Sequence, residues 1–351
     1  MVLAGGAGTR FWPAGRRAKP KQLLAVTEER SMLAVTLDRC AAIAPPERTF
    51  VVTNAAQAEA TRPHCKDLPE GNVVAEPAMR NTAAAIALGL AHVARRDPEG
   101  VIVVLPADHH IQPKDAFAAC FKAAARRAAE ADVLLTIGIP PTGPATGYGY
   151  IQSGAEVARV DGLPVHGVES FKEKPDAATA ARFLSQGGYF WNSGIFVWRA
   201  SVLREAFRAH LPGHYAVLEG IEERLARGEP VPEADYERFE RVPVDTGILE
   251  KADNVEVIPA TFTWDDVGSW LAIDRLFPRD KDGNLVRGDH VGVDTRNCLV
   301  VSRGHLVATV GVEDMIIVHT PDATLVCPKD RAEEVRAIVQ RLRDEGRDAH
   351  L

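Results

Sequence analysis

Residues 5–21 read GGAGTRFWPAGRRAKPK and directly follow the apolar run Met1–Ala4. The apolar run predicts the end of a first strand. The glycines after it let backbone N–H groups approach a polyphosphate, because no Cβ stands in the way. Arg10 adds a planar guanidinium and Lys21 a mobile ammonium, which hold phosphate oxygens in two different ways. The pattern predicts a basic phosphate-binding loop after the first strand of an α/β sheet.

Two commoner phosphate-binding loops do not fit this stretch. A Walker A loop needs four residues between its glycines and then Gly-Lys-Ser or Gly-Lys-Thr, which does not occur here. A dinucleotide fingerprint starts with Gly6 and Gly8, but Phe11 occupies the third glycine position and Pro13 blocks an uninterrupted helix. An ordinary glycine turn with solvated charges is the alternative, although such turns seldom combine three glycines, an arginine and a Pro-flanked lysine.

Composition narrows the class of protein. The chain has 351 residues, of which 46% are hydrophobic and 25% charged, as in a soluble globular protein with one large and one small domain. Its net charge of −7 argues against a nucleic-acid partner. The longest apolar stretch, 83–91, is too short to span a membrane. Five widely spaced cysteines predict reduced thiols and a cytoplasmic protein, with no secretory signal visible.

The order of apolar runs predicts two domains. Strand patterns near 51–52, 73–75, 101–105 and 133–139 alternate with helical ones, which predicts a doubly wound, Rossmann-like mixed α/β sheet. Beyond a polar linker at 278–288, short strand patterns recur every eight to ten residues and a terminal helix covers 331–343. We therefore expect a catalytic domain at 1–277 and a small all-β, partly β-helical domain at 285–351.

Two separate acidic positions are candidates for a metal site. Asp108 follows the apolar strand 101–105, where α/β folds place ligands. Asp265 and Asp266 lie in the segment 262–270, and composition does not separate them. Two carboxylates with nucleotide phosphates suit Mg²⁺. An aspartate after a strand also often only caps a turn.

The segment 76–82, Glu-Pro-Ala-Met-Arg-Asn-Thr, joins a strand to a helix. Asn81 or Thr82 could simply cap that helix. Glu76 could in addition bind a nucleobase. A carboxylate accepts hydrogen bonds from both N1–H and N2–H₂ of guanine, whereas uracil and thymine present one N–H between two carbonyls. The segment thus favours recognition of a guanine base by Glu76 with support from Asn81.

Three later segments suit a sugar phosphate. Gly149 lies in a flexible Gly-Tyr-Gly loop, Glu173 and Lys174 end a strand, and Asn192 lies beside Trp191. The carboxylate and the amide can bind neighbouring hydroxyls, and the ammonium can meet a 1-phosphate. Each segment alone is weak, since Lys-Glu-Lys-Pro is also a common surface turn.

Taken in order over residues 1–270, these segments resemble the sugar-1-phosphate nucleotidylyltransferases, and Gln22-Leu23-Leu24 after Lys21 favours the mannose-1-phosphate guanylyltransferases among them. The resemblance extends to Glu-Pro-x-x-Arg-Asn-Thr of the members that use GTP. In the related Trp-x-Asp-Val-Gly-Ser-Trp element, Asp266 occupies the aspartate and Asp265 a variable position, so Asp265 is expected to be solvated. The resemblance also implies nucleotide contacts from Leu3, Ala4, Gly5, Gly6, Gly8, Thr9, Glu76, Asn81 and Thr82.

What the resemblance implies is transfer from GTP to mannose 1-phosphate, giving GDP-mannose and pyrophosphate. Arg10 and Lys21 would hold the triphosphate, Asp108 and Asp266 a Mg²⁺ ion, and Lys174 the acceptor. A uridylyl-, thymidylyl- or adenylyltransferase acting on glucose 1-phosphate stays open, as does a non-catalytic nucleotide-sugar-binding subunit. A homodimer is also open.

Overall fold

The computed structural model describes residues 1–6 and 8–351. These residues divide into two compact units. The first comprises Met1–Gly5, Leu37–Ala107 and Ile111–Trp264, and the second comprises Gly6–Thr36, Asp108–His110 and Asp265–Leu351. The division into domains at 1–277 and 285–351 stays a prediction. Within the described residues, no helix has both the length and the apolar character required to cross a bilayer.

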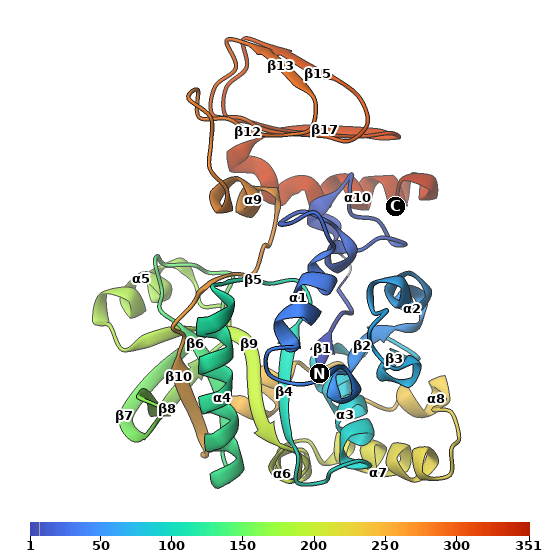
Figure 1. Ribbon diagram of the computed structural model, residues 1–351, viewed down its shortest axis with the longest axis vertical. Helices are drawn as coiled ribbons and strands as arrows, with labels where there is room; N and C mark the ends of the chain where they lie inside the picture. Colours follow the sequence, from blue (N-terminus) through green and yellow to red (C-terminus); the bar gives the residue numbers. More distant parts are fainter. Residues whose placement is uncertain (7) are drawn as a thin grey trace. The chain divides into compact units, whose positions relative to one another are not determined.

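The first unit is built on a nine-stranded mixed sheet with the order β3-β2-β1-β4-β9-β6-β10-β8-β7 (Figure 1). Strands β3, β2, β1 and β4 run parallel, and β9 lies antiparallel between β4 and β6. The strands are β1 (Val2–Leu3), β2 (Val51–Asn54), β3 (Val73–Glu76), β4 (Val101–Pro106), β6 (Leu134–Ile139), β7 (Tyr150–Val160), β8 (Leu163–Lys172), β9 (Tyr189–Arg199) and β10 (Val255–Pro259). A separate pair joins β5 (His110–Gln112) to β11 (Thr263–Asp265).

Helices cover both faces of this sheet. On β9, Phe196 and Trp198 lie in one core with helices α3, α6 and α7, whereas the alternate residues Ile195 and Val197 are buried outside that core, on the side of α4 (Figure 1). Sheets covered on both faces require such near-continuous apolar strands. The helices of the first unit are α2 (Ala55–Thr61), α3 (Asn81–Ala94), α4 (Lys114–Glu130), α5 (Ala177–Gln186), α6 (Ala200–His210), α7 (Pro212–Ala226) and α8 (Glu233–Tyr236). The division between the units falls within α1 (Met32–Cys40), before Leu37.

The second unit contains a short β-helix. Strands β12, β14 and β16 stack in parallel with Leu285, Leu299 and Ile316 in register, β13 and β15 form a second wall, and β17 closes the first antiparallel. Their bounds are β12 (Leu285–Arg287), β13 (His290–Val293), β14 (Leu299–Ser302), β15 (Val307–Val310), β16 (Met315–Thr320) and β17 (Ala323–Pro328). Helices α9 (Trp270–Leu276) and α10 (Val335–Asp344) belong to the same unit.

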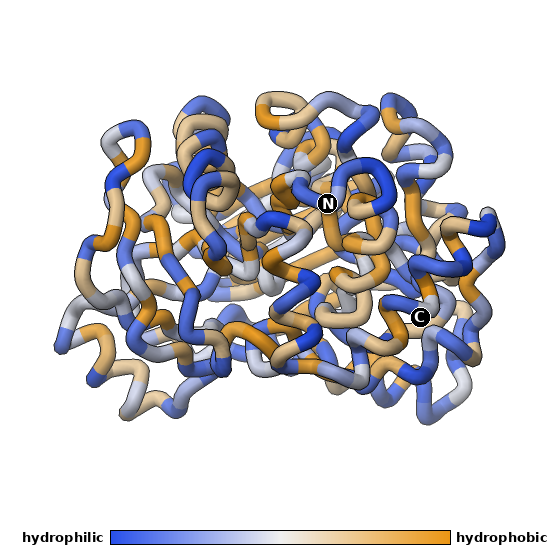
Figure 2. Tube along the Cα trace, turned by 90° about the horizontal axis from the view of Figure 1, so that it is seen from below, coloured by the Kyte–Doolittle hydropathy of each residue, from blue (hydrophilic) through white to orange (hydrophobic). Residues whose placement is uncertain are grey.

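The core of the second unit joins segments that lie at opposite ends of the chain. Phe11 and Trp12 of the N-terminal loop share one buried cluster with Trp270, with the β-helix and with α10. Figure 1 shows this blue loop beside the red α10. Along the trace, hydrophobic stretches are interrupted by hydrophilic ones (Figure 2). The β-rich module is therefore the packing partner of the loop that the sequence marks for phosphate binding.

Most expected elements are confirmed, and two of the helices begin with side-chain hydrogen bonds to their first turn. Ser31 Oγ accepts from Ala34 N, and Asn54 Oδ1 accepts from Gln57 N. Two expectations are wrong. Residues 278–288 include β12 and are not only a linker, and the expected terminal helix starts with a 3-10 turn at Lys329–Glu334. Strands β7 and β8 also form a long hairpin that the sequence analysis did not predict. The weak hydrophobic alternation of the exposed hairpin explains why its length was missed.

Candidate active site

The glycine-rich loop folds back on Lys21. Gly8 has φ 61°, and a Cβ built on it would lie 2.5 Å from the backbone nitrogen of Lys21, so both conformation and space require glycine. Two 3-10 turns follow, Thr9–Phe11 and Lys21–Leu23. Because Phe11 is fully buried, the turn that carries Arg10 is anchored to the core of the second unit.

Lys21 brings the two predicted metal-binding aspartates together. Its side chain is 10% exposed, and its Nζ lies 2.7 Å from Asp108 Oδ2 and donates to the backbone oxygen of Asp266 at 2.5 Å. Burial disfavours the ionised form of Asp108, but the ammonium of Lys21, together with His109, holds the pKa of Asp108 below its usual range. A buried cation thus fixes Asp108 as a carboxylate and places Asp266 beside it.

The carboxylate of Asp266 lies close to Arg10. A Cβ built on Gly268 would lie 3.1 Å from Asp266 Oδ2 and 3.3 Å from Arg10 Nη1, so both groups flank the same glycine. Arg10 also forms a 3.5 Å ion pair with Glu333 of the terminal segment, which is exposed to solvent. Arg10, Lys21, Asp108 and Asp266 therefore lie within one unit, as the sequence motifs predict for a phosphate and metal site.

The expectation for Asp265 is wrong. Its side chain is only 15% exposed, its Oδ1 accepts from Val267 N at 2.7 Å, and its Oδ2 pairs with Arg275 at 3.3 Å. Val267 has φ 48°, a left-handed conformation that costs a β-branched residue about 1–3 kcal/mol. Asp265 thus stabilises the strained turn that presents Asp266, which its position in the motif did not indicate.

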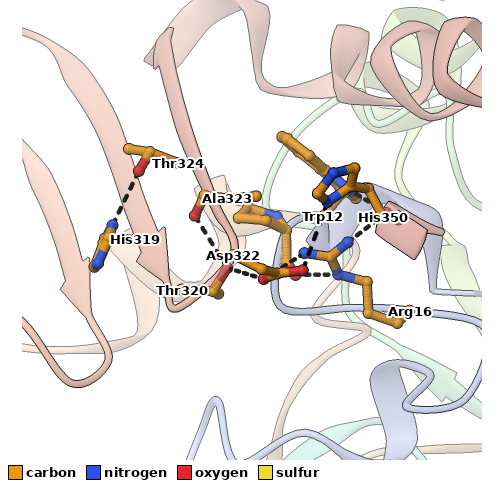
Figure 3. Close-up of polar contacts among 9 residues, drawn as sticks. Trp12, Arg16, His319, Thr320, Asp322, Ala323, Thr324 and His350 are labelled. Atoms are coloured by element: carbon orange, nitrogen blue, oxygen red, sulfur yellow. Dashed lines mark hydrogen bonds and ion pairs between the residues drawn. The ribbon is translucent and has the colours of Figure 1, made fainter. Parts of the chain in front are cut away.

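The loop is also held from the C-terminal end of the chain. Figure 3 shows Trp12 Nε1 and Arg16 donating to the backbone oxygen of His350, with Arg16 also 3.0 Å from Asp322 Oδ1. Trp270 Nε1 donates to Trp12 O from another side. We call Trp12, Arg16, Asp322 and His350 the loop clamp. No local motif in the sequence predicts the loop clamp, because Trp12 and Arg16 lie more than 300 positions before Asp322 and His350.

The predicted base-recognition residues lie at one edge of the sheet in the first unit. Glu76 ends β3 and is 6% exposed, and Gly5 follows β1, with a built Cβ 3.5 Å from Glu76 Oε2. Asn81 is the first residue of α3, has φ 70°, and its Oδ1 accepts from Thr82 N, whereas the N-cap position is Arg80 and has no side-chain capping bond, so the capping alternative is wrong. Gly6 and Thr9 belong to the second unit.

Backbone groups of the first strand form hydrogen bonds with neighbouring strands of the sheet. Leu3 O accepts from Ala107 N at 2.9 Å, and Ala4 N donates to Val52 O at 2.7 Å. These groups are therefore engaged within the sheet, and contacts of Leu3 and Ala4 with a nucleotide stay a prediction.

The predicted sugar residues also converge within the first unit. A Cβ built on Gly149 would lie 2.5 Å from Glu173 Oε2 and 3.3 Å from Asn192 Cβ, so the glycine leaves room between them. Asn192 N donates to Gly149 O at 2.8 Å. Lys174 pairs with the carboxylate of Glu173 and is largely exposed. Together, a carboxylate, an amide and an ammonium line one spot, as a hydroxyl- and phosphate-bearing ligand requires.

Two family models match this chain. The family model described as "Nucleotidyl transferase" matches residues 1–282. The chain belongs to the nucleotidyl transferase family. A second model, "MannoseP isomerase/GMP-like beta-helix domain", matches residues 288–342, over most of the observed β-helix.

Full-length relatives agree with the assignment. Alginate biosynthesis protein AlgA of Pseudomonas aeruginosa is 35% identical over 99% of this chain and 72% of its own length. Mannose-1-phosphate guanylyltransferase of Escherichia coli K12 is 35% identical over 100% of this chain and 74% of its own length. A Thermus thermophilus structure described as a mannose-1-phosphate geranyltransferase superimposes with TM-score 0.88 and 37% identity, covering 97% of this chain and 98% of that one.

The residues of this nucleotidyl transferase fit a Mg²⁺ ion of the phosphate-bridging kind. The described residues contain no cluster of three or more His, Cys, Asp or Glu side chains, so no all-protein cage is present among them. Mg²⁺ commonly takes one or two carboxylates together with substrate phosphates and water. The carboxylate of Asp108, which pairs with Lys21, and that of Asp266, whose backbone oxygen accepts from Lys21, are the donors that would hold it.

Sequence reasoning missed two groups of the nucleotidyl transferase that contact predicted site residues. Tyr236 is fully buried and its hydroxyl donates to Glu76 Oε1 at 2.7 Å. Asp245 Oδ1 accepts from Asn192 Nδ2 at 2.7 Å. A lone aspartate inside the otherwise uncharged run 242–249 was the available signal for Asp245. For Tyr236 no sequence signal exists, since one tyrosine beside several glutamates is typical of any surface helix.

Proposed function

We propose that this chain transfers the guanylyl group of GTP to mannose 1-phosphate, giving GDP-mannose and pyrophosphate. One observation carries the proposal. A single buried ammonium, Lys21 Nζ, contacts both Asp108 and Asp266 next to the arginine of a glycine-rich loop. The naming of the Escherichia coli relative supports the choice of guanine nucleotide and mannose phosphate.

The chemistry needs alignment and charge neutralisation more than proton transfer. The second pKa of a sugar phosphate is about 6, so its oxygen is already anionic near neutral pH and no general base is required. That oxygen forms a bond to the α-phosphorus of GTP while the bond to the bridging oxygen breaks and pyrophosphate leaves. Mg²⁺, when bound, would neutralise charge on the phosphates.

Residues of this chain supply the remaining charges. Arg10 and Lys21 hold triphosphate oxygens, and the ionised state of Asp108 keeps it ready for a metal. Gly5, Gly6 and Gly8 let backbone N–H groups reach the phosphates. We assign further nucleotide contacts to Leu3, Ala4, Thr9, Asn81 and Thr82.

The acceptor sugar would be held by the convergent polar groups of the first unit. Glu173 and Asn192 bind hydroxyls across the space that Gly149 leaves open, and Lys174 meets the 1-phosphate. The bond that Lys174 makes to Glu173 would then be exchanged for a bond to phosphate, which is a local and low-cost change for an exposed side chain.

The base is recognised by Glu76. Burial, only partly opposed by the bond from Tyr236, raises the pKa of Glu76 to about 7. Burial removes water from the Glu76 carboxylate. Guanine can replace the lost hydrogen bonds, because its N1–H and N2–H₂ both donate to a carboxylate. Losing this charge-assisted pair costs on the order of 2 kcal/mol, or about thirtyfold in preference for guanine.

A substrate panel tests the proposal. Pyrophosphate release is measured with GTP, ATP, UTP and dTTP, each with mannose 1-phosphate and with glucose 1-phosphate, in Mg²⁺ and after chelation. We expect the highest kcat/KM for GTP with mannose 1-phosphate and no turnover in chelator. A faster reaction with another base or with glucose 1-phosphate contradicts the substrate assignment, and absence of any turnover favours a nucleotide-sugar-binding subunit.

Two further parts of the proposal concern context. The described cysteines are free thiols, four of them buried, which agrees with a reducing, cytoplasmic environment. A homodimer stays a prediction, to be tested by sedimentation.

A further inference from the structure

One segment of the first unit, residues 233–249, contacts both predicted recognition sites. We infer that Tyr236 and Asp245 are positioning residues carried by this support segment: Tyr236 orients the carboxylate that recognises guanine, and Asp245 orients the amide that binds the sugar. The inference rests on the proposed function and extends it to residues that touch neither substrate.

Tyr236 can orient the carboxylate of Glu76 because the side chain of Tyr236 is itself held in place by packing. Its ring is fully buried and packs edge-on against Phe239, with centroids 5.1 Å apart. Its hydroxyl donates to Glu76 Oε1, while Glu76 Oε2 faces Gly5. One oxygen is thereby tied and the plane of the carboxylate is set. A bidentate contact with guanine depends on that plane, since both oxygens must point at the base edge.

The segment is tied to the base-recognition turn at more than this point. Arg80 pairs with Glu237 at 2.7 Å. Val244 N donates to Thr82 Oγ1 at 2.9 Å, and Ala83 N donates to Val242 O at 3.2 Å. Two polar groups in the first turn of α3, the Thr82 hydroxyl and Ala83 N, are therefore bonded to the support segment, which keeps the turn and the segment in one register.

Asp245 leaves Asn192 a single amide orientation. Asn192 Nδ2 donates to Asp245 Oδ1 at 2.7 Å, and Asn192 Oδ1 accepts from Gly194 N at 3.1 Å. A flipped amide would place oxygen against carboxylate and N–H against N–H, so both bonds would be lost. With this orientation fixed, one N–H and one lone pair of Asn192 remain for sugar hydroxyls beside Glu173.

Tyr236 and Asp245 lie in one segment, but Tyr236 orients a side chain that binds the nucleotide and Asp245 orients one that binds the sugar. We therefore expect the two substitutions to change different kinetic parameters. Loss of the Tyr236 hydroxyl should weaken the preference for the guanine nucleotide and leave KM for the sugar phosphate unchanged. Loss of the Asp245 carboxylate should raise KM for the sugar phosphate and leave the nucleotide preference unchanged. A purely structural role for either residue would lower stability and activity toward both substrates alike.

The test for Tyr236 compares GTP with inosine triphosphate, which lacks the 2-amino group. We expect Tyr236→Phe to reduce the kcat/KM preference for GTP over inosine triphosphate about tenfold, with KM for mannose 1-phosphate unchanged. Tyr215→Phe is the matched control, since its hydroxyl lies 3.4 Å from Arg204 Nη2 and contacts neither Glu76 nor Asn192. A preference that survives Tyr236→Phe overturns the inference. If the parent enzyme has no guanine preference, the proposed function fails as well.

The test for Asp245 uses a graded pair. Asp245→Ala should raise KM for mannose 1-phosphate about tenfold while the preference for GTP over inosine triphosphate stays as in the parent. Asp245→Asn should recover most of the loss, because its amide oxygen can accept the same bond; Asp245→Leu, which also lacks an acceptor, replaces the alanine variant if that variant does not fold. Asp235→Asn, which breaks a 2.8 Å pair with Arg224 in the same segment, is the control. If the variant that lacks the Asp245 acceptor affects both substrates equally, or affects neither, the inference is overturned.

Discussion

Replacing Glu76 with glutamine should make the protein more stable at neutral to alkaline pH while weakening its preference for guanine. Glu76 is 6% exposed, and burial raises its pKa from the usual 4.5 to about 7. The folded protein thus binds a proton on Glu76 more tightly than the unfolded chain. The free energy of unfolding must then fall as the pH rises from the unfolded pKa to the folded one, and level off above it.

The magnitude follows from the same two values. A pKa raised from 4.5 to about 7 corresponds to about 3 kcal/mol of stability lost once Glu76 is fully ionised. Glutamine carries no charge and its oxygen can still accept from Tyr236. Its N–H groups replace Glu76 Oε2 near Gly5, and a buried unpaired amide costs about 1–2 kcal/mol. Glu76→Gln should therefore gain about 1–2 kcal/mol at about pH 8 and lose a similar amount at about pH 5.

Urea unfolding of parent and variant at these two pH values measures the effect. The control is Glu59→Gln, an exposed glutamate of α2, for which the stability difference should not depend on pH. A stability difference between Glu76→Gln and the parent that is the same at both pH values refutes the reasoning, as does a variant less stable at the higher pH. GTP-over-UTP preference, measured in parallel, should fall about thirtyfold.

Three further predictions concern the second unit. Lys21→Met should lower kcat about 10²–10³-fold with little change in KM for mannose 1-phosphate, because the cation acts on the triphosphate; the opposite pattern in steady-state kinetics would contradict this role. Asp266→Asn should abolish Mg²⁺-dependent turnover, whereas Asp265→Asn should cost less than about tenfold and mainly lower thermal stability; near-normal turnover of Asp266→Asn would defeat the metal assignment. Arg16→Leu should reduce kcat about tenfold by releasing the loop clamp, as measured by pyrophosphate release, and a loss confined to thermal stability would show that the clamp has no part in turnover.

The sequence predicted the fold through local signals. Continuous apolar strands such as 101–105 and the Ala-rich pattern of α3 specify a covered sheet, because period and length are properties of neighbouring residues. The recurring short strands predicted a partly β-helical domain but not the register of its coils, since Leu285, Leu299 and Ile316 occupy one column at unequal spacings. An irregular repeat of this kind becomes visible only when the coils stack.

The candidate site divides along the same line. By itself, the sequence determined which groups carry charge and flexibility: the glycines of the loop, Lys21 and the aspartates that follow strands. Only the tertiary structure decided which of them are restrained, placing Asp265 on a strained turn, Tyr236 against Glu76 and Asp245 against Asn192. The physical reason is the separation along the sequence between residues that interact. A motif is read from adjacent residues, whereas Glu76 and Asn192 are oriented by hydrogen bonds from Tyr236 and Asp245, which lie 160 and 53 positions away.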